Sequence, residues 1–292
     1  MKAYDITFDI TPQDPTRTWS YDPQNKTLVA DQAAVTEAGW LGSRGPGISD
    51  EQWPRSPHTG LPMQHIFTLH LPEPYRRRGP EYVAVSFFAG DSWEIIQETP
   101  PLLLKEHSDT PLTTQLRQYQ PHPMFQELHD SLGGVFGLLY LTREEFSARS
   151  NGPTNPYREG EQFIILPPHQ RTRLFTQWGT AHPTQALGLV YRPDPNAGVP
   201  PADDGINGYE DPWDEETGDF RNWADPLFSK CHLGGTALPG QSLPPRLSAY
   251  YLEITEMGVL EFGDCGSAQI DLDNNVFAGP AARRTPQKPP IF

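Results

Sequence analysis

Short apolar runs separated by Pro, Gly and Asp recur along the chain, and this pattern predicts strands more often than helices. Each run is shorter than an average helix. The expected strands, in chain order, are residues 4–10, 65–71, 82–88, 135–141, 162–166, 173–177, 186–191, 249–255, 259–262 and 268–272. The chain is therefore expected to be rich in β-structure.

Two stretches have helical features instead. Three apolar residues repeat at intervals of four within 123–132, which predicts a helix there. The capping-box spacing of Thr142 and Glu145 predicts the start of a second helix. The Asn-Gly pair at 151–152 is expected to close it, because both residues tolerate a left-handed backbone.

These elements predict an α+β, β-rich fold in which antiparallel sheets and a few short helices form a single compact unit over residues 1–292. A glycine turn followed by two strands occurs twice, which fits half-repeats at about 40–150 and 160–275. Glycine turns before strands are common, so an internal duplication and a chance similarity both stay open. Residues 276–292 form a basic, proline-bearing tail.

Composition and charge exclude several classes of protein. The chain has 33 Pro and 25 Gly, which favour turns, and 14 Phe, 11 Tyr and 7 Trp, which can fill a core. A net charge of −15 opposes binding to nucleic acid and to anionic membranes. There is no apolar run long enough to span a membrane and no secretory signal, so the sequence predicts a soluble cytoplasmic protein.

The negative charge is concentrated between residues 203 and 225. Nine acidic residues lie there against a single Arg, and large aromatic residues are interleaved with them. Acidic charge attracts a basic protein, and Trp and Tyr are frequent in interface hot spots. We therefore expect a basic protein partner to bind here. The predicted partner-binding residues are Asp203, Asp204, Tyr209, Glu210, Asp211, Trp213, Asp214, Glu215, Glu216, Asp219 and Trp223.

Glycine-containing turns followed by strands give the chain a family resemblance. These segments are Trp53-Pro54, Gly60-Leu61-Pro62-Met63, Gly234-Gly235, Leu238-Pro239-Gly240-Gln241, Tyr250-Tyr251-Leu252-Glu253-Ile254 and Phe262-Gly263-Asp264-Cys265-Gly266. Their order resembles the bacterial YwqG-like family, although Phe262 stands where the family usually has Trp. The resemblance implies a single β-rich α+β unit and brings no known active site. Proteins of this kind can be encoded near toxin genes.

Catalytic and metal-binding motifs are missing from the sequence. It contains no phosphate-binding loop, no nucleophile elbow and no His-Glu-x-x-His segment. Two cysteines give no disulfide framework and no paired-Cys zinc motif. His122 and His129 are seven residues apart, but His122 precedes a proline, so we do not expect them to share a metal ion. No cofactor is expected, and calcium binding by the acidic stretch is left open.

Two functions remain in competition, and the first is favoured. The first is a non-enzymatic binding protein, most simply an immunity protein that neutralises a basic interbacterial toxin. The alternative is an enzyme or a small-ligand-binding protein with a site in a cleft between the half-repeats. In that case His65, His70, His232 and Asp264 should converge on one pocket with perturbed pKa values.

Overall fold

The computed structural model describes a large part of the chain. The described residues are 1–8, 18–22, 27–31, 35–58, 60–90, 111–130, 134–153, 184–202, 207–228, 230–239, 243–255, 257, 260, 262, 266–274 and 277–278.

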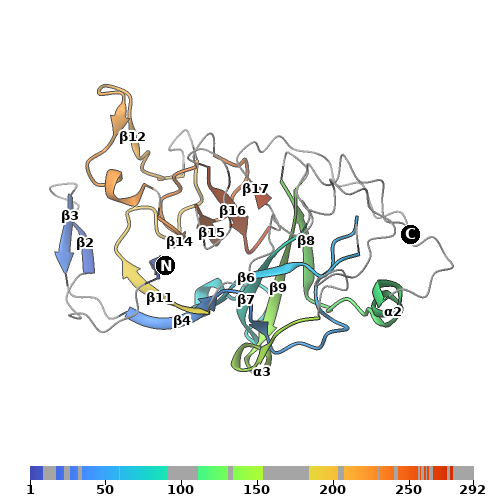
Figure 1. Cartoon of the computed structure of the whole chain (residues 1–292). Helices are drawn as coiled ribbons and strands as arrows, with labels where there is room; N and C mark the ends of the chain where they lie inside the picture. Colours follow the sequence, from blue (N-terminus) through green and yellow to red (C-terminus); the bar gives the residue numbers. More distant parts are fainter. Residues whose placement is uncertain are drawn as a thin grey trace.

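Eleven of the strands found in these residues form one antiparallel sheet (Figure 1). Their order across the sheet is β17 (Phe277–Ala278), β16 (Ala268–Asp271), β15 (Tyr251–Ile254), β14 (His232–Leu233), β1 (Ala3–Thr7), β11 (Gln185–Arg192), β4 (Val35–Leu41), β6 (Gln64–His70), β7 (Tyr82–Ala89), β9 (Val135–Thr142) and β8 (Phe125–His129).

Short ladders and helices complete the described fold. The two-stranded ladders are β2 (Thr18–Asp22) with β3 (Thr27–Asp31), β5 (Gly45–Pro46) with β10 (Arg149–Ser150), and β12 (Trp213–Asp214) with β13 (Asp219–Phe220). The helices are α2 (Pro111–Gln118), α3 (Arg143–Ser147) and the 3-10 turns η1 (Glu73–Tyr75) and η2 (Asp225–Leu227). None of these helices is long or apolar enough to cross a membrane.

Two arms of the sheet extend from the central pair β1 and β11. One arm runs β4-β6-β7-β9-β8 and the other runs β14-β15-β16-β17. The sheet curls so that the arms face each other (Figure 1). Phe136 of the first arm packs on Phe262, with ring centroids 6.0 Å apart, and the Tyr140 hydroxyl lies 3.4 Å from the carbonyl of Leu272.

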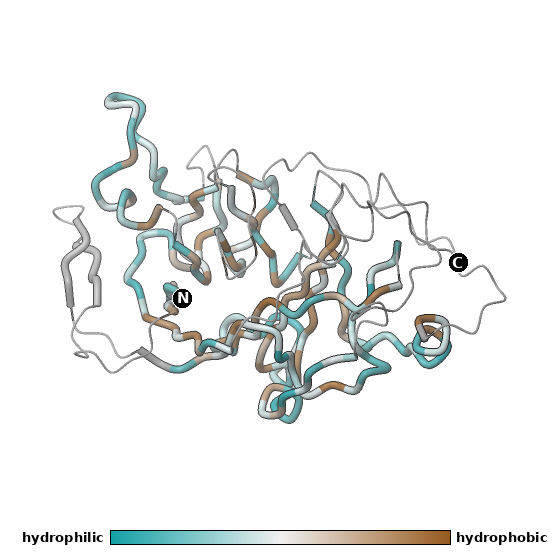
Figure 2. Tube along the Cα trace, viewed as in Figure 1, coloured by the Kyte–Doolittle hydropathy of each residue, from teal (hydrophilic) through white to brown (hydrophobic). Residues whose placement is uncertain are grey.

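The hydrophobic core fills the space between the arms. It includes Phe67 and Phe87 from the first arm and Leu252 and Ile270 from the second, each at most 1% exposed. Figure 2 shows hydrophobic stretches, in brown, along the strands of both arms. At roughly 25 cal/mol per Å² of apolar area buried, such burial is the main force that holds the curled sheet closed.

The β-rich fold class is confirmed, and so are most of the predicted strands. Those at 4–10, 65–71, 82–88, 135–141, 186–191, 249–255 and 268–272 correspond to β1, β6, β7, β9, β11, β15 and β16. Of the predicted strand 259–262 the structure describes two residues, and Leu260 forms an isolated bridge with Met257. The predicted strands 162–166 and 173–177 lie outside the described residues, as does the tail apart from 277–278.

The predicted helix over 123–132 is wrong, because the structure places strand β8 there. Apolar residues at intervals of four share one face of a helix, but an even interval also places them on one face of a strand. The segment forms a strand and not a helix because it pairs with β9. Leu128 lies opposite Phe136 in this pair and is 4% exposed. The strand thereby becomes the edge of the sheet.

The predicted second helix begins where expected but ends earlier than predicted. Thr142 and Glu145 form the reciprocal capping box at the start of α3. The helix ends at Ser147 rather than at 151–152, because Arg149–Ser150 pairs with Gly45–Pro46 as the β5–β10 ladder. The half-repeats stay a prediction.

Candidate protein-binding surface

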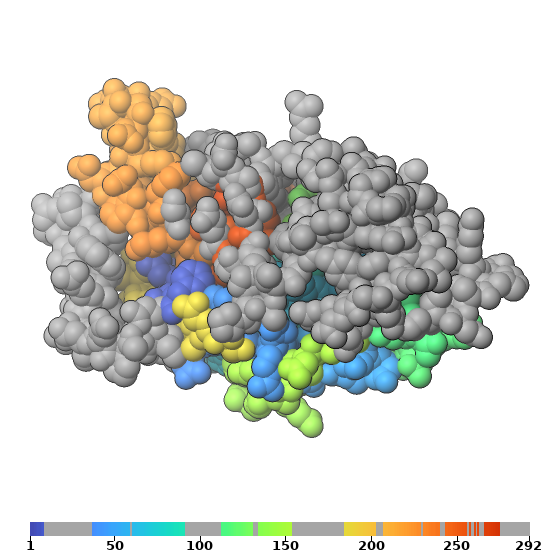
Figure 3. All heavy atoms as spheres, viewed as in Figure 1, coloured from blue at the N-terminus to red at the C-terminus, as the bar shows by residue number. Residues whose placement is uncertain are grey.

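Residues 207–228 form a projecting segment, here called the acidic hairpin, whose centre is the ladder β12–β13. Trp213 pairs with Phe220, and Asp214 pairs with Asp219. The turn between the strands uses Gly218 with a φ of +69°, a conformation that a side chain would strain. Figures 1 and 3 show the acidic hairpin, in orange, standing out from the body of the molecule.

Aromatic rings reach the surface on the acidic hairpin. Trp213 and Phe228 are each 42% exposed. Phe220 lies between them, 5.3 Å from the Trp213 ring and 5.6 Å from the Phe228 ring, measured between centroids. Three packed rings therefore form a ridge that is partly open to solvent. Phe228 was not predicted, and its place directly after the buried Leu227 gives no local signal that it is exposed.

Carboxylates surround this ridge. Glu210, Asp211, Glu215, Glu216 and Asp219 are exposed, and Asp214 is partly buried. Residues 207–228 contain seven acidic residues and one Arg, a net charge of −6. By contrast, the described residues between 35 and 153 contain nine acidic residues and eight Arg, a net charge of −1. The negative charge is thus localised on the acidic hairpin.

Three of these carboxylates also shape the backbone. One oxygen of Asp211 accepts from the N–H of Trp213 (2.9 Å), one of Asp214 accepts from that of Glu216 (3.0 Å), and one of Asp219 accepts from that of Phe220 (2.7 Å). Such turns order the segment locally. The predicted residues Asp203 and Asp204 lie outside the described residues.

Two of the predicted partner-binding aromatics are buried instead, so they are not available at the surface. Tyr209 is 4% exposed, and its hydroxyl accepts from the N–H of Ala237 (2.9 Å). Trp223 is 1% exposed and packs with Leu227 and Leu238. The prediction failed here because each ring fastens one end of the acidic hairpin to the loop 234–238. Trp213 is the predicted aromatic that remains exposed.

A second contact fastens the foot of the acidic hairpin at Glu210. The side chain of Asn196, which is 0% exposed, donates from Nδ2 to the carbonyl of Glu210 (2.8 Å). Its Oδ1 accepts from the N–H of Glu210 (2.7 Å). The same Nδ2 lies 3.0 Å from the hydroxyl of Thr236. One buried amide therefore satisfies both backbone groups of Glu210.

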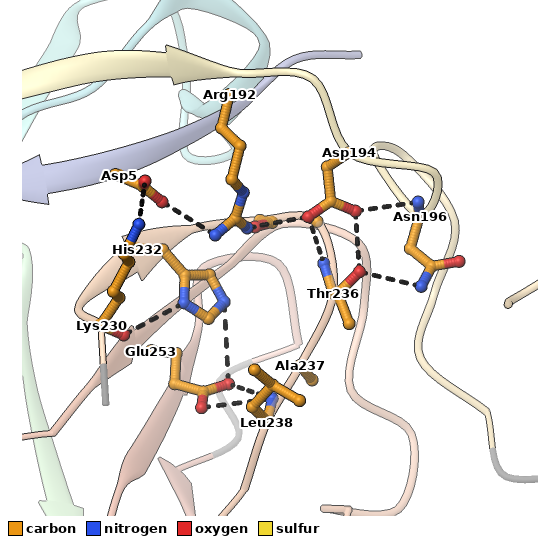
Figure 4. Close-up of polar contacts among 12 residues, drawn as sticks. Asp5, Arg192, Asp194, Asn196, Lys230, His232, Thr236, Ala237, Leu238 and Glu253 are labelled. Atoms are coloured by element: carbon orange, nitrogen blue, oxygen red, sulfur yellow. Dashed lines mark hydrogen bonds and ion pairs between the residues drawn. The ribbon is translucent and has the colours of Figure 1, made fainter. Parts of the chain in front are cut away.

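A buried ion-pair network supports this contact (Figure 4). Arg192, 2% exposed, donates to a carboxylate oxygen of Asp194 and to one of Asp5, each at 2.8 Å. Asp194 also accepts from the hydroxyl of Thr236 (2.8 Å) and from the N–H of Asn196 (2.9 Å). The second oxygen of Asp5 lies 3.3 Å from the ammonium of Lys230. The network thus joins β1, β11, the residues that flank β14 and the foot of the acidic hairpin.

His232 and Glu253 form the deeper part of the same cluster. Their facing atoms, Nε2 and Oε2, are 3.7 Å apart. Burial, helped by the positive charge of Arg192, lowers the pKa of His232 to about 4. Burial raises the pKa of Glu253 to about 8, although the N–H of Leu238, which donates to its carboxylate at 3.1 Å, opposes the shift. Both side chains are therefore neutral near pH 7.

The glycine pair that carried the family resemblance lines this cluster. Gly234 and Gly235 have φ angles of +63° and +89°. A Cβ on Gly234 would overlap the hydroxyl of Tyr75, and a Cβ on Gly235 would lie 2.6 Å from a carboxylate oxygen of Asp194. Glycine is therefore required at both positions so that the loop can turn around the network.

The histidines of the alternative hypothesis do not converge in the described residues. His65 binds Gly42 and Thr68, whereas His70 lies beside Arg76. The contacts of His232 involve other residues altogether, and Asp264 lies outside the described residues. The perturbed pKa values expected at a shared pocket are found, but in separate buried clusters.

His122 and His129, which were not expected to share a metal ion, face different carboxylates. The Nε2 of His122 lies 2.8 Å from a carboxylate oxygen of Glu145, and that of His129 lies 2.6 Å from one of Glu127. Each imidazole therefore has its own carboxylate. Within the part of the chain that the structure describes, no three His, Cys, Asp or Glu side chains gather as metal ligands would.

No family model matches the chain, and the comparisons found no similar protein among curated proteins or solved structures. The resemblance to the YwqG-like family therefore stays a prediction.

Proposed function

We propose that the protein binds a basic protein partner through the acidic hairpin. The observation that carries this proposal is the combination, on one projecting segment, of exposed aromatic rings and localised negative charge. Trp213 supplies the apolar contact that gives affinity, and the carboxylates around it attract a positively charged surface and speed its approach. The same charge opposes binding to nucleic acid.

The class of partner that fits best is a basic toxin domain, so that the protein would act as an immunity protein in the cytoplasm. A toxin that acts on nucleic acid needs a basic surface to neutralise phosphates. An acidic, ring-bearing hairpin is complementary to such a surface and would block it. Binding without catalysis is sufficient for this role.

The binding step is tested with a twelve-residue peptide of alternating Lys and Arg, titrated by calorimetry at low salt. We expect binding that weakens as salt is added, because exposed charges are screened. Trp213→Ala should weaken the Kd about tenfold or more, as loss of a hot-spot ring does. Since Trp213 is exposed, its substitution should change the free energy of unfolding by no more than about 0.5 kcal/mol.

Tyr191→Ala is the matched control, because Tyr191 is an aromatic residue of similar exposure, 38%, on strand β11. It should leave the Kd unchanged. A peptide that does not bind, or that binds equally well to Trp213→Ala, would overturn the proposed surface. The toxin-specific part is tested by co-expression with a basic toxin domain that acts on nucleic acid: rescue of growth by the wild type but not by Trp213→Ala is expected.

A further inference from the structure

The acidic hairpin is fastened at both ends to one loop, which comprises residues 234–238. At its start, Tyr209 accepts from the N–H of Ala237 (2.9 Å). At its end, Trp223 and Leu227 pack on Leu238. A projecting segment with two exposed rings is thus held by buried contacts at its foot, and the middle of the segment carries the exposed groups.

We infer that Asn196 is a positioning residue for docking: it fixes the foot of the acidic hairpin so that the binding ridge is ordered before a partner arrives. The inference rests on the proposed function, since it explains how the proposed surface is presented. Asn196 is 0% exposed and cannot itself touch a partner.

The hydrogen bonds of Asn196 favour this role over simple filling of the core. Its side chain receives the N–H of Glu210 and donates to the carbonyl of the same residue, at 2.7 Å and 2.8 Å. These are the two bonds that a neighbouring strand would make, and Glu210 adjoins the exposed part of the hairpin. The remaining hydrogen of Nδ2 points to Thr236 at 3.0 Å. The amide has a partner for both of its donors.

The orientation of Asn196 is set by Asp194. This carboxylate accepts from the N–H of Asn196 (2.9 Å) and from the N–H of Thr236 (3.0 Å), the two residues that meet at Nδ2. Asp194 is in turn neutralised by Arg192 at 2.8 Å. The foot of the acidic hairpin is therefore connected to a buried ion pair of the central sheet rather than to a solvated surface loop.

The consequence for binding is preorganisation. A hairpin that is disordered when free loses conformational freedom when it binds, and this loss reduces affinity. A hairpin that is already fixed avoids that loss. Removal of the clamp should therefore weaken binding even though every residue that touches the partner is unchanged.

Asn196→Ala tests this inference, with Asn274→Ala as the matched control. Asn274 also donates from Nδ2 to a backbone carbonyl, that of Arg246 (3.3 Å), but it belongs to the loop after β16, and its other hydrogen bonds are to Asp271. Two quantities are measured: hydrogen exchange of the amides of residues 209–228 and of strand β7, and the Kd of the Lys-Arg peptide.

For Asn196→Ala we expect about tenfold faster exchange confined to the acidic hairpin, no change in β7, and a peptide Kd weakened by roughly fivefold to tenfold. Asn274→Ala should change neither quantity. Unchanged exchange in the hairpin would overturn the inference, and so would faster exchange with an unchanged Kd. If exchange accelerates equally in β7, Asn196 is a general structural residue and the inference fails.

A milder variant keeps the test decisive if Asn196→Ala does not fold. Thr236→Ala removes the hydroxyl that accepts from Asn196 but leaves both bonds to Glu210, so smaller changes of the same sign are expected, and the inference fails if neither quantity changes. A wild-type protein that does not bind the peptide would refute the proposed function, while the exchange measurement would still report whether Asn196 orders the hairpin.

Discussion

Two of the buried histidines, His65 and His232, lie in regions of different chemistry. His65 in β6 and His232 in β14 are each at most 2% exposed. Burial lowers the pKa of both imidazoles to about 4. Both rings are therefore neutral near pH 7, and what distinguishes them is the chemistry of their neighbours.

His65 forms hydrogen bonds with uncharged groups, a backbone carbonyl and a hydroxyl. Its Nδ1 donates to the carbonyl of Gly42 (2.6 Å), so its Nε2 accepts from the hydroxyl of Thr68 (2.8 Å). Thr68 also pairs with the hydroxyl of Ser86, its cross-strand neighbour on β7. The ring of Trp40 stacks on the imidazole at 6.2 Å. These groups form a closed cluster within one arm of the sheet.

His232 is surrounded by charged side chains, and this charged cluster extends to the foot of the acidic hairpin. Arg192, Asp194 and Asp5 form ion pairs beside it, and Glu253 faces it at 3.7 Å. Buried charges are expensive, and apolar groups could fill the same volume with equal or greater stability. The structure instead uses these charges where the central sheet meets the foot of the acidic hairpin. The comparison indicates that the His65 region serves the core, whereas the His232 region links the core to the proposed docking surface.

The largest expected effect comes from breaking the charged cluster. Arg192→Met leaves Asp194 and Asp5 without their shared partner, and removing one member of a buried ion pair typically costs about 3–5 kcal/mol. Unfolding in urea, followed by circular dichroism, measures this loss.

Arg221→Met is the control for that experiment, because Arg221 pairs with Asp214 at 3.5 Å near the surface. An exposed pair contributes at most about 1 kcal/mol. If both variants lose the same free energy of unfolding, the buried network has no special role and the comparison collapses.

How far the sequence predicted these regions depends on the range of the interactions. Strands such as β7 and β9 were predicted because each is a continuous apolar run with turn residues at its ends. Strand β8 was missed because apolar spacing of four fits both periods, and pairing with β9 decides between them. Local patterns therefore describe the elements well where one period dominates.

The candidate site was predicted in its charge but not in its burial. The acidic and aromatic composition of 207–228 is visible in the sequence. That Tyr209 and Trp223 point inward depends on the loop 234–238, which follows later in the chain. Asn196 was missed because Asp194-Pro195-Asn196 has the composition of an ordinary turn. Its neighbour in the network, Arg192, binds Asp5 from 187 positions away, and such a pair leaves no local signal.

The pH dependence of the free energy of unfolding should differ between the His65 cluster and the cluster of His232 and Glu253. The pKa of each histidine is lowered in the folded state, so below about pH 6.5 the unfolded chain binds more protons, and stability is lost as the pH falls towards 4. The pKa of Glu253 is raised from 4.5 to about 8, so the folded state holds a proton that the unfolded chain releases. Stability from this group is therefore lost as the pH rises through that window.

Glu253→Gln should remove the alkaline loss and keep the acidic one. The expected difference is a slope on the order of 1 kcal/mol per pH unit between pH 6 and 8 in the wild type, and a flatter profile in the variant. Urea unfolding at a series of pH values measures it. A wild-type profile that is already flat over this range would show that Glu253 does not carry a raised pKa.

The smallest effect on the acidic hairpin is expected from a change in the neutral cluster around His65. Thr68→Val removes the hydroxyl that serves His65 and Ser86, which should cost about 1–3 kcal/mol because buried polar atoms lose their partner. The loss should stay within that arm of the sheet: hydrogen exchange of residues 209–228 and the Kd of the Lys-Arg peptide should equal those of the wild type. The hydrogen bonds of the Thr68 hydroxyl are to His65 and Ser86, in β6 and β7. Faster exchange in the acidic hairpin of this variant would therefore mean that any loss of stability loosens the hairpin, and the distinct role of the charged network would then have no support.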